Sequence, residues 1–342
     1  MRMKRVVYHT FCLFLLAAPL QARRDSVVVV HAHEQKVFQR QVPAGNYSGI
    51  THLEGNEYAV VNDKSATDGF NVFAIDIDSI TGEILNVQDR GFRSAEAANR
   101  DGEGIAYLPS TKTILISGEA DGKILEYGLD GHRTIREAAV PEIFSKMRSN
   151  LGFEALTYSA ATRLVWTCNE STLQGDGEAS SPTNGVANVV RLQCFDEALR
   201  PLRQYAYRMD APMASASAEL YAMGVPELVA LEDGSLLVLE REFYVPSSKL
   251  GAFVNCRLYQ AWPSVEIDKE KPIGEETVFA DKNLVYEWKT SLGLFSHEIA
   301  NYEGMCLGPL LRDGSRALIL VSDSQNQYGG VLKDWFKTIV LR

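Results

Sequence analysis

One short pattern occurs five times along this chain of 342 residues, beginning near residues 47, 101, 152, 225 and 301. A strand-like segment opens near an acidic residue, a polar turn follows, and a strongly apolar segment closes on a second acidic residue. The clearest copy starts at Asp101-Gly102-Glu103-Gly104-Ile105 and ends its second segment at Glu119. A repeated unit of this kind buries its apolar face only against its neighbours, which restricts the chain to repeat architectures.

Third and fourth strand-like segments follow most copies. Residues 72–78 alternate apolar and polar side chains, as a half-buried strand does. The fifth copy stops at a third segment, 338–341, while segments 27–30 and 36–42 precede the first copy. An N-terminal strand that completes the last unit would close a ring, so we predict an all-β fold, a β-propeller of four-stranded blades.

Two features of this fold are left open by the repeats. Five repeats are visible, but residues 250–300 are long enough to contain a sixth blade. A two-domain β-sandwich is the structural alternative.

Residues 1–22 read as a signal peptide. Arg2, Lys4 and Arg5 precede an apolar stretch, 11–20, that is too short to span a bilayer, and Ala22 suits a cleavage site. We therefore expect an exported protein, periplasmic or secreted, with a single domain over residues 23–342 and no integral membrane segment after cleavage. We also expect it to be monomeric.

The net charge argues against nucleic-acid partners. It is −10 for the whole chain and −13 without residues 1–22, which carry three basic residues and no acid. Nucleic-acid binding depends on cationic contacts to phosphate, whereas an acidic surface favours cations or solubility.

Four cysteines remain after the signal segment: Cys168, Cys194, Cys256 and Cys306. They are widely spaced and form no CxxC pair, so a zinc site is disfavoured. One disulfide or four buried free thiols are both compatible with this spacing.

The acidic residues of the repeats are the candidate site. In a propeller, the start of each first strand and the end of each second strand lie on the same face of the ring. We therefore expect nine carboxylates around one mouth of the central channel: Asp63, Glu103, Glu119, Glu154, Glu170, Glu227, Glu240, Glu303 and Asp323.

Carboxylates this close together must bind protons, basic side chains or metal ions. Calcium takes six to eight oxygen ligands, so we predict Ca²⁺ or another divalent cation at the mouth. Asn62 and Asn169 precede two of the acids and could add carbonyl ligands. The competing interpretation is that many of these acids are solvated turn residues or pair with Arg and Lys.

Three further residues lie near the repeats. Arg241, between Glu240 and Glu242, could clamp an anion or neutralise the acids, and we favour neutralisation. His297 is a candidate general base, although a lone histidine is more often structural or solvated. Asp101 is either a ligand or a turn residue.

Several catalytic motifs are absent from the sequence. It contains no G-x-S-x-G elbow, H-E-x-x-H, P-loop or Rossmann glycine pattern. Serine-hydrolase chemistry of the α/β type and nucleotide-dependent chemistry are therefore disfavoured.

Four motifs resemble the phytase-like family described by esterase-like activity. They are Asp101-Gly-Glu-Gly-Ile105, Asn150-Leu-Gly-Phe-Glu-Ala-Leu156, Leu236-Leu-Val-Leu-Glu-Arg-Glu-Phe243, and Asn301-Tyr-Glu-Gly-Met305 with Val321-Ser-Asp323. They span residues 45–342. The sequence departs from the family's repeat pattern at Ser48, where an acid is expected, and at Ser324-Gln325-Asn326 after Asp323.

The resemblance implies metal-dependent hydrolysis but does not establish a substrate. Together with the signal peptide, it leads us to expect an exported hydrolase that acts on a small-molecule phosphate or carboxylic ester. Its candidate catalytic residues are Glu154, Glu303, Arg241 and His297, with a ring glutamate as general base. Phytate itself is strongly anionic and would need bridging cations to bind here. The alternatives are a non-catalytic propeller that binds a ligand or partner around a structural calcium ion, and a lactonase-like propeller enzyme.

Overall fold

The computed structural model describes residues 25–149, 151–293 and 297–342. The predicted signal peptide, residues 1–22, lies outside the described residues. No helix within these described ranges is long and apolar enough to cross a membrane.

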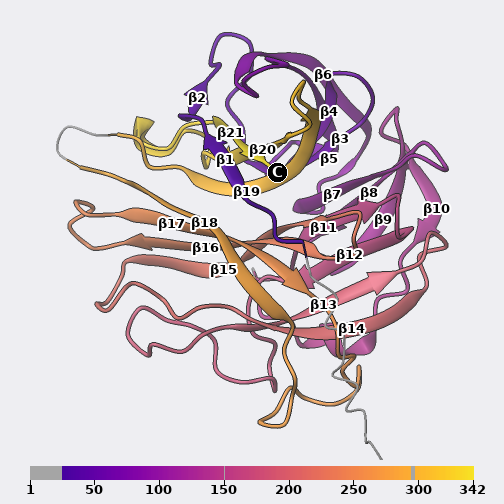
Figure 1. Cartoon of the computed structure of the whole chain (residues 1–342), viewed down its shortest axis with the longest axis vertical. Coiled ribbons are helices and arrows are strands. Elements are labelled where there is room, and N and C mark those ends of the chain that lie inside the picture. The colour runs from indigo at the N-terminus through magenta and orange to yellow at the C-terminus, as the bar shows by residue number, and fades with distance from the viewer. Residues whose placement is uncertain (1–24, 150, 294–296) are drawn as a thin grey trace, which may run out of the picture.

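The described residues form five antiparallel sheets arranged as the blades of a propeller (Figure 1). Blade 1 contains β3 (Tyr47–His52), β4 (Glu57–Asn62), β5 (Thr67–Ile77) and β6 (Ile84–Ala98). Blade 2 contains β7 (Gly102–Leu108), β8 (Thr113–Gly118), β9 (Lys123–Gly128) and β10 (Arg133–Glu137). Blade 3 contains β11 (Phe153–Ser159), β12 (Leu164–Asn169), β13 (Val189–Phe195) and β14 (Pro201–Arg208).

Blade 4 contains β15 (Leu220–Ala230), β16 (Leu236–Val245), β17 (Phe253–Trp262) and β18 (Asp281–Ser291). Blade 5 contains β19 (Asn301–Leu310), β20 (Arg316–Asp323), β21 (Trp335–Leu341) and β1 (Val29–Ala32), and β2 (Lys36–Val37) also pairs with β21. Two short 3₁₀ helices, η1 (Glu142–Lys146) and η2 (Tyr328–Gly330), lie in connections.

The two ends of the described chain meet in blade 5 (Figure 1). Strand β1 pairs antiparallel with β21, with Val29 opposite Leu341. The predicted all-β propeller closed by an N-terminal strand is therefore confirmed. Within residues 250–300, the described strands are β17 and β18, which complete blade 4, so the described part of this segment adds no sixth blade.

Apolar side chains pack mainly between neighbouring blades. One cluster joins Leu192 of blade 3 to Val238 of blade 4, and another joins Leu258 of blade 4 to Leu320 of blade 5. This burial supplies the main favourable free energy for closing the ring. All four cysteines after residue 24 are buried free thiols.

Each first strand carries a β-bulge at the point where its repeat motif begins. In blade 2, Gly102 faces Gly118 and Ile105 faces Ile116, so β7 has one extra residue at Glu103-Gly104. The glycine is required by the neighbouring blade, because a Cβ on Gly104 would lie 2.3 Å from the backbone oxygen of Glu154. The Glu-Gly motif thus allows close approach of first strands while the bulge sets the direction of the glutamate.

Candidate functional site

Seven of the nine predicted carboxylates line one pocket of about 370 Å³. Three come from the bulges of first strands, and four come from the ends of second strands. They are Glu103, Glu154 and Glu303, and Asp63, Glu119, Glu170 and Asp323. Among the described residues, the cationic side chains that line the same pocket are Lys64 and Arg241. We call this site the acidic pocket.

Two of the bulge glutamates are buried without a hydrogen-bond donor. Glu103 is 6 % exposed and Glu154 is 9 % exposed. Among the described residues, no donor contacts either carboxylate, and their electrostatic neighbours are mostly other acids. Neither carboxylate is among the fully buried, unpartnered groups, but burial still makes the ionised forms costly, which favours binding of a proton or a cation.

Arg241 is the buried cation of the acidic pocket. Its Nη2 lies 2.6 Å from Glu170 Oε1, and its Nη1 lies 3.1 Å from Glu303 Oε1. Nη1 also donates to Asn301 Oδ1 at 2.9 Å. Burial opposes its charge, but Glu303 and Glu170 raise the pKa of Arg241 above its ordinary value. Arg241 therefore neutralises and orients the carboxylates, and both of its terminal nitrogens are already engaged.

A second group of acids lies at the blade 1 to blade 2 side of the pocket. Asp63, Asp101 and Glu103 each place a carboxylate oxygen within 4.8 Å of the other two. Lys64 Nζ lies 3.1 Å from Asp63 and 2.5 Å from Asp101, although its side chain is 52 % exposed. Asp63 Oδ1 is buried and has no partner among the described atoms.

Burial shifts the proton affinities of these carboxyls in one direction. Desolvation, reinforced by Glu154 and Asp63, raises the pKa of Glu103 well above its usual range. Desolvation, with Glu170 and Glu303, does the same to the pKa of Glu154. Burial raises the pKa of Asp323 to about 7, even though the Gln325 backbone N–H donates to its carboxylate. The clustered, desolvated carboxylates therefore favour binding of a proton or another cation in the pocket.

Glu227 and Glu240 do not line the acidic pocket, so their predicted placement was wrong. Strand β15 is offset in blade 4: Gly224 faces Arg241, which puts Val225 at the bulge position and Glu227 two residues deeper. There Glu227 accepts hydrogen bonds from the backbone N–H groups of Leu156 and Leu228. The equivalent strand position in the other blades is apolar and is occupied by Ile50, Ile105, Leu156 and Met305.

Glu240 points away from the pocket because side chains alternate along a strand, and its neighbour Arg241 points in. Its carboxylate accepts from Tyr207 Oη and Lys282 Nζ, each at 2.6 Å. The acid that corresponds in position to Glu119 and Glu170 is Glu242, but β16 continues through Val245 and turns it outward. Glu242 accepts from the backbone N–H groups of Met213 and Ala214.

His297 lies outside the acidic pocket as well. It is exposed and forms an isolated bridge with Leu292. Sequence reasoning missed Lys64 and Asn301 as pocket residues, although each stands beside a repeat acid or opens a repeat motif. Ser48, the departure in the first repeat, is buried and donates to the Asn46 carbonyl at 3.4 Å, so it adds no charge to the ring.

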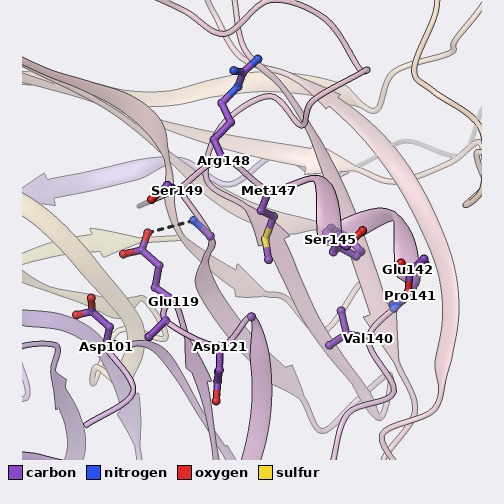
Figure 2. A pocket seen from close by; sticks show the side chains of 14 residues that line it. Asp101, Glu119, Asp121, Val140, Pro141, Glu142, Ser145, Met147, Arg148 and Ser149 are labelled. Atoms are coloured by element: carbon purple, nitrogen blue, oxygen red, sulfur yellow. Dashed lines mark hydrogen bonds between the residues drawn. The ribbon is translucent and has the colours of Figure 1, made fainter.

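A larger, solvent-facing pocket of about 590 Å³ adjoins the acidic pocket (Figure 2). Glu119 lines both pockets, and Asp101 lines the larger one. The Glu119 carboxylate accepts the backbone N–H of Gly152 at 3.2 Å, and this hydrogen bond is the dashed line in Figure 2. Val140, Phe144 and Met147, on and beside η1, form its apolar wall. Its volume suits a small-molecule ligand.

The donor set of the acidic pocket fits a hard divalent cation. It offers carboxylate and amide oxygens, no thiolate and no described histidine, which is the ligand chemistry calcium and magnesium prefer. The unpartnered Asp63 Oδ1 and the donor-free Glu103 carboxylate are atoms that such an ion would satisfy.

The fold and pocket define a five-bladed β-propeller with an acidic site at one mouth of its channel. A family model described as "Phytase-like: Esterase-like activity of phytase" matches residues 42–325. The chain therefore belongs to this phytase-like family, as its repeat motifs predicted.

Several solved structures show a weak similarity to this chain, with TM-scores below 0.5. A luciferin-regenerating enzyme is 12 % identical with a TM-score of 0.43, over 90 % of this chain and 94 % of that one. A streptogramin B lyase is 13 % identical with a TM-score of 0.37, over 91 % and 98 %. A periplasmic gluconolactonase of Pseudomonas aeruginosa is 14 % identical with a TM-score of 0.32, over 83 % and 67 %. The search of curated proteins gave no significant match.

Proposed function

We propose that the protein is a metal-dependent hydrolase of a small-molecule ester and that the acidic pocket is its active site. The observation that carries this proposal is the pair of buried carboxylates, Glu103 and Glu154, in the pocket that Arg241 also lines. Membership of a family described by esterase-like activity supports it.

Asp63, Asp101 and Glu103 would hold the cation, because their carboxylate oxygens already converge. Lys64, which now pairs with two of them, is half-exposed and can turn into solvent at little cost. When bound, the ion would supply Lewis-acid polarisation of the ester's carbonyl or phosphoryl oxygen.

Glu154 is the best-placed general base among the candidates. Its carboxylate is free of donors, whereas Glu303 is engaged by Arg241 and Asn301. The raised pKa of Glu154 suits a group that accepts a proton from the attacking water and returns it to the leaving oxygen as the ester bond breaks. Glu170 and Glu303 hold Arg241 in place, and Arg241 limits repulsion among the carboxylates.

One observation favours a second candidate, a non-catalytic propeller that binds a ligand around a structural ion. The terminal nitrogens of Arg241 are already paired within the protein, as in a purely structural charge network. Such a protein would use the same carboxylates to hold its blades together.

Metal-dependent turnover by the purified protein from residue 23 onward separates the two functions. The substrates are p-nitrophenyl acetate, p-nitrophenyl phosphate, phytate and a simple lactone, each with calcium and after chelation, with the melting temperature recorded in parallel. The test variant is Glu154→Gln, and the matched control is Glu240→Gln, whose carboxylate faces away from the pocket.

The proposed hydrolase predicts turnover that disappears on chelation and falls at least about a hundredfold in Glu154→Gln, the usual contribution of a general base. Glu240→Gln should retain activity at temperatures where it is folded. Absence of turnover on every substrate, together with a calcium-dependent rise in melting temperature, would replace the hydrolase with the binding propeller.

A further inference from the structure

A small apolar pocket of about 120 Å³ lies next to the acidic pocket. Phe243 and Gln325 line both pockets, so the two sites adjoin. The other lining side chains are almost all hydrocarbon, which contrasts with the seven carboxylates on the acidic side. We call this second site the apolar pocket.

Strand β16 connects the two pockets directly. Arg241 and Phe243 are two residues apart and therefore project from the same face of the strand. This spacing corresponds to about 7 Å along the strand. A molecule with its polar group near Arg241 would consequently place an attached group against the Phe243 ring.

The apolar pocket has a fixed floor and an open rim. Ala252, Ile299 and Leu332 are buried in the core shared by blades 4 and 5. Leu220 and Tyr328, at the rim, are 46 % and 60 % exposed. A floor set by core packing and a rim open to solvent allow entry of a ligand group without opening the core.

Charge complementarity decides which ligand fits. The lining cation of the apolar pocket, Lys249, is already paired with Glu219 at 2.5 Å. On the other side, seven carboxylates face two basic residues. A multiply phosphorylated substrate would thus meet repulsion on one side and no polar partner on the other.

We propose that the apolar pocket is the subsite for the hydrocarbon group of a neutral carboxylic ester. This rests on the proposed function and narrows it from phosphate or carboxylic esters to carboxylic esters with an apolar acyl group. The volume is somewhat below the roughly 150 Å³ of an engineered cavity that binds benzene, so an acyl chain of about four to six carbons fits.

Two measurements on the calcium-loaded protein test the subsite. The first is kcat/KM for p-nitrophenyl acetate, butyrate, hexanoate and decanoate. The second is calorimetric binding of 1-hexanol, a neutral probe that needs no turnover. The test variant is Val331→Trp, which narrows the pocket from its lining, and the matched control is Leu310→Trp at an exposed position outside this lining.

The proposal predicts that kcat/KM rises at least about tenfold from acetate to hexanoate and falls again for decanoate, since each buried methylene is worth about a fourfold gain. Val331→Trp should remove the preference for hexanoate and the binding of 1-hexanol, while keeping activity on acetate. Leu310→Trp should change none of these quantities.

The outcomes separate this inference from the proposed function. Ester hydrolysis with no chain-length preference and no 1-hexanol binding would overturn the subsite and leave the hydrolase standing. Binding of 1-hexanol that Val331→Trp abolishes, with no turnover of any ester, would overturn the hydrolase but support an apolar ligand site. Preference for phytate over every carboxylic ester would overturn the proposed substrate class.

Discussion

Arg241 of blade 4 contacts Glu170 of blade 3 through a buried ion pair, with Nη2 2.6 Å from Oε1. Both side chains are at most 5 % exposed, so neither charge is solvated by water to any extent. The ion pair therefore couples the stability of two blades to the charge balance of the acidic pocket.

Arg241→Gln should destabilise the metal-free protein by about 3–5 kcal/mol, because it leaves carboxylates buried without their cation. Urea unfolding monitored by tryptophan fluorescence measures this loss. The matched control is Arg342→Gln, which removes an exposed pair with Asp313 and should cost at most about 1 kcal/mol. Equal losses of unfolding free energy in the two variants would show that the buried network stabilises the protein no more than an exposed ion pair does.

The stability of the metal-free protein should fall as pH rises from 5 to 8. A carboxyl whose pKa is higher in the folded protein binds its proton more tightly there, so folding is favoured below that pKa and opposed above it. For Asp323 the loss runs from its ordinary value of 3.8 up through about 7, and Glu103 and Glu154 shift in the same direction.

Calcium should remove most of this pH dependence, because a bound cation stabilises the ionised carboxylates. Melting temperatures across pH 5 to 8, with calcium and with chelator, provide the comparison. A chelated protein that becomes more stable toward pH 8 would contradict the charge assignment of the pocket.

Glu103→Gln should weaken calcium binding at least about tenfold, or about 1.4 kcal/mol. Glu227→Gln should change it by less than about twofold, because Glu227 lies deeper in the channel and accepts backbone hydrogen bonds there. Calorimetric titration of both variants makes the comparison at constant net charge. Equal losses in the two variants would mean that the ion sits within the channel rather than at its mouth.

Lys64→Met should tighten calcium binding by about fivefold, the effect of roughly 1 kcal/mol from removing an exposed competing charge. The same substitution should lower the stability of the chelated protein, since Asp63 and Asp101 lose their counter-ion. Lys123→Met, which disrupts an exposed pair with Glu137, serves as the control. Calcium binding that weakens in Lys64→Met would exclude this corner as the cation site.

The repeats predicted the fold because each blade encodes the same strand order with its own turns. They also located the carboxylates of blades 2, 3 and 5, where the acid stands immediately before the bulge glycine or alanine, as in Glu103-Gly104. Blade 4 differs, because its motif reads Val225-Pro226-Glu227. The position of the acid in the sequence predicted Glu227 at the bulge, whereas it lies two residues further along β15.

The remaining site residues depend on three-dimensional relations that one sequence does not display. Whether Arg241 or Glu240 points into the channel is decided by the register of β16 against β15. The contact between the acidic and apolar pockets depends on Gln325, which lies in the connection between β20 and β21 of blade 5 yet lines both pockets together with Phe243 of blade 4.

The closure of blade 5 has a consequence for biosynthesis. Strand β21 lies between β20 and β1, so the ring can close only after Leu341 has been synthesised and can pair with Val29. At synthesis rates of about 5–20 residues per second, the intervening chain takes roughly 15–60 s to appear. During that interval the early blades have no closed ring, the carboxylates of Asp63 and Asp323 are not yet neighbours, and β1 has no β21 with which to pair.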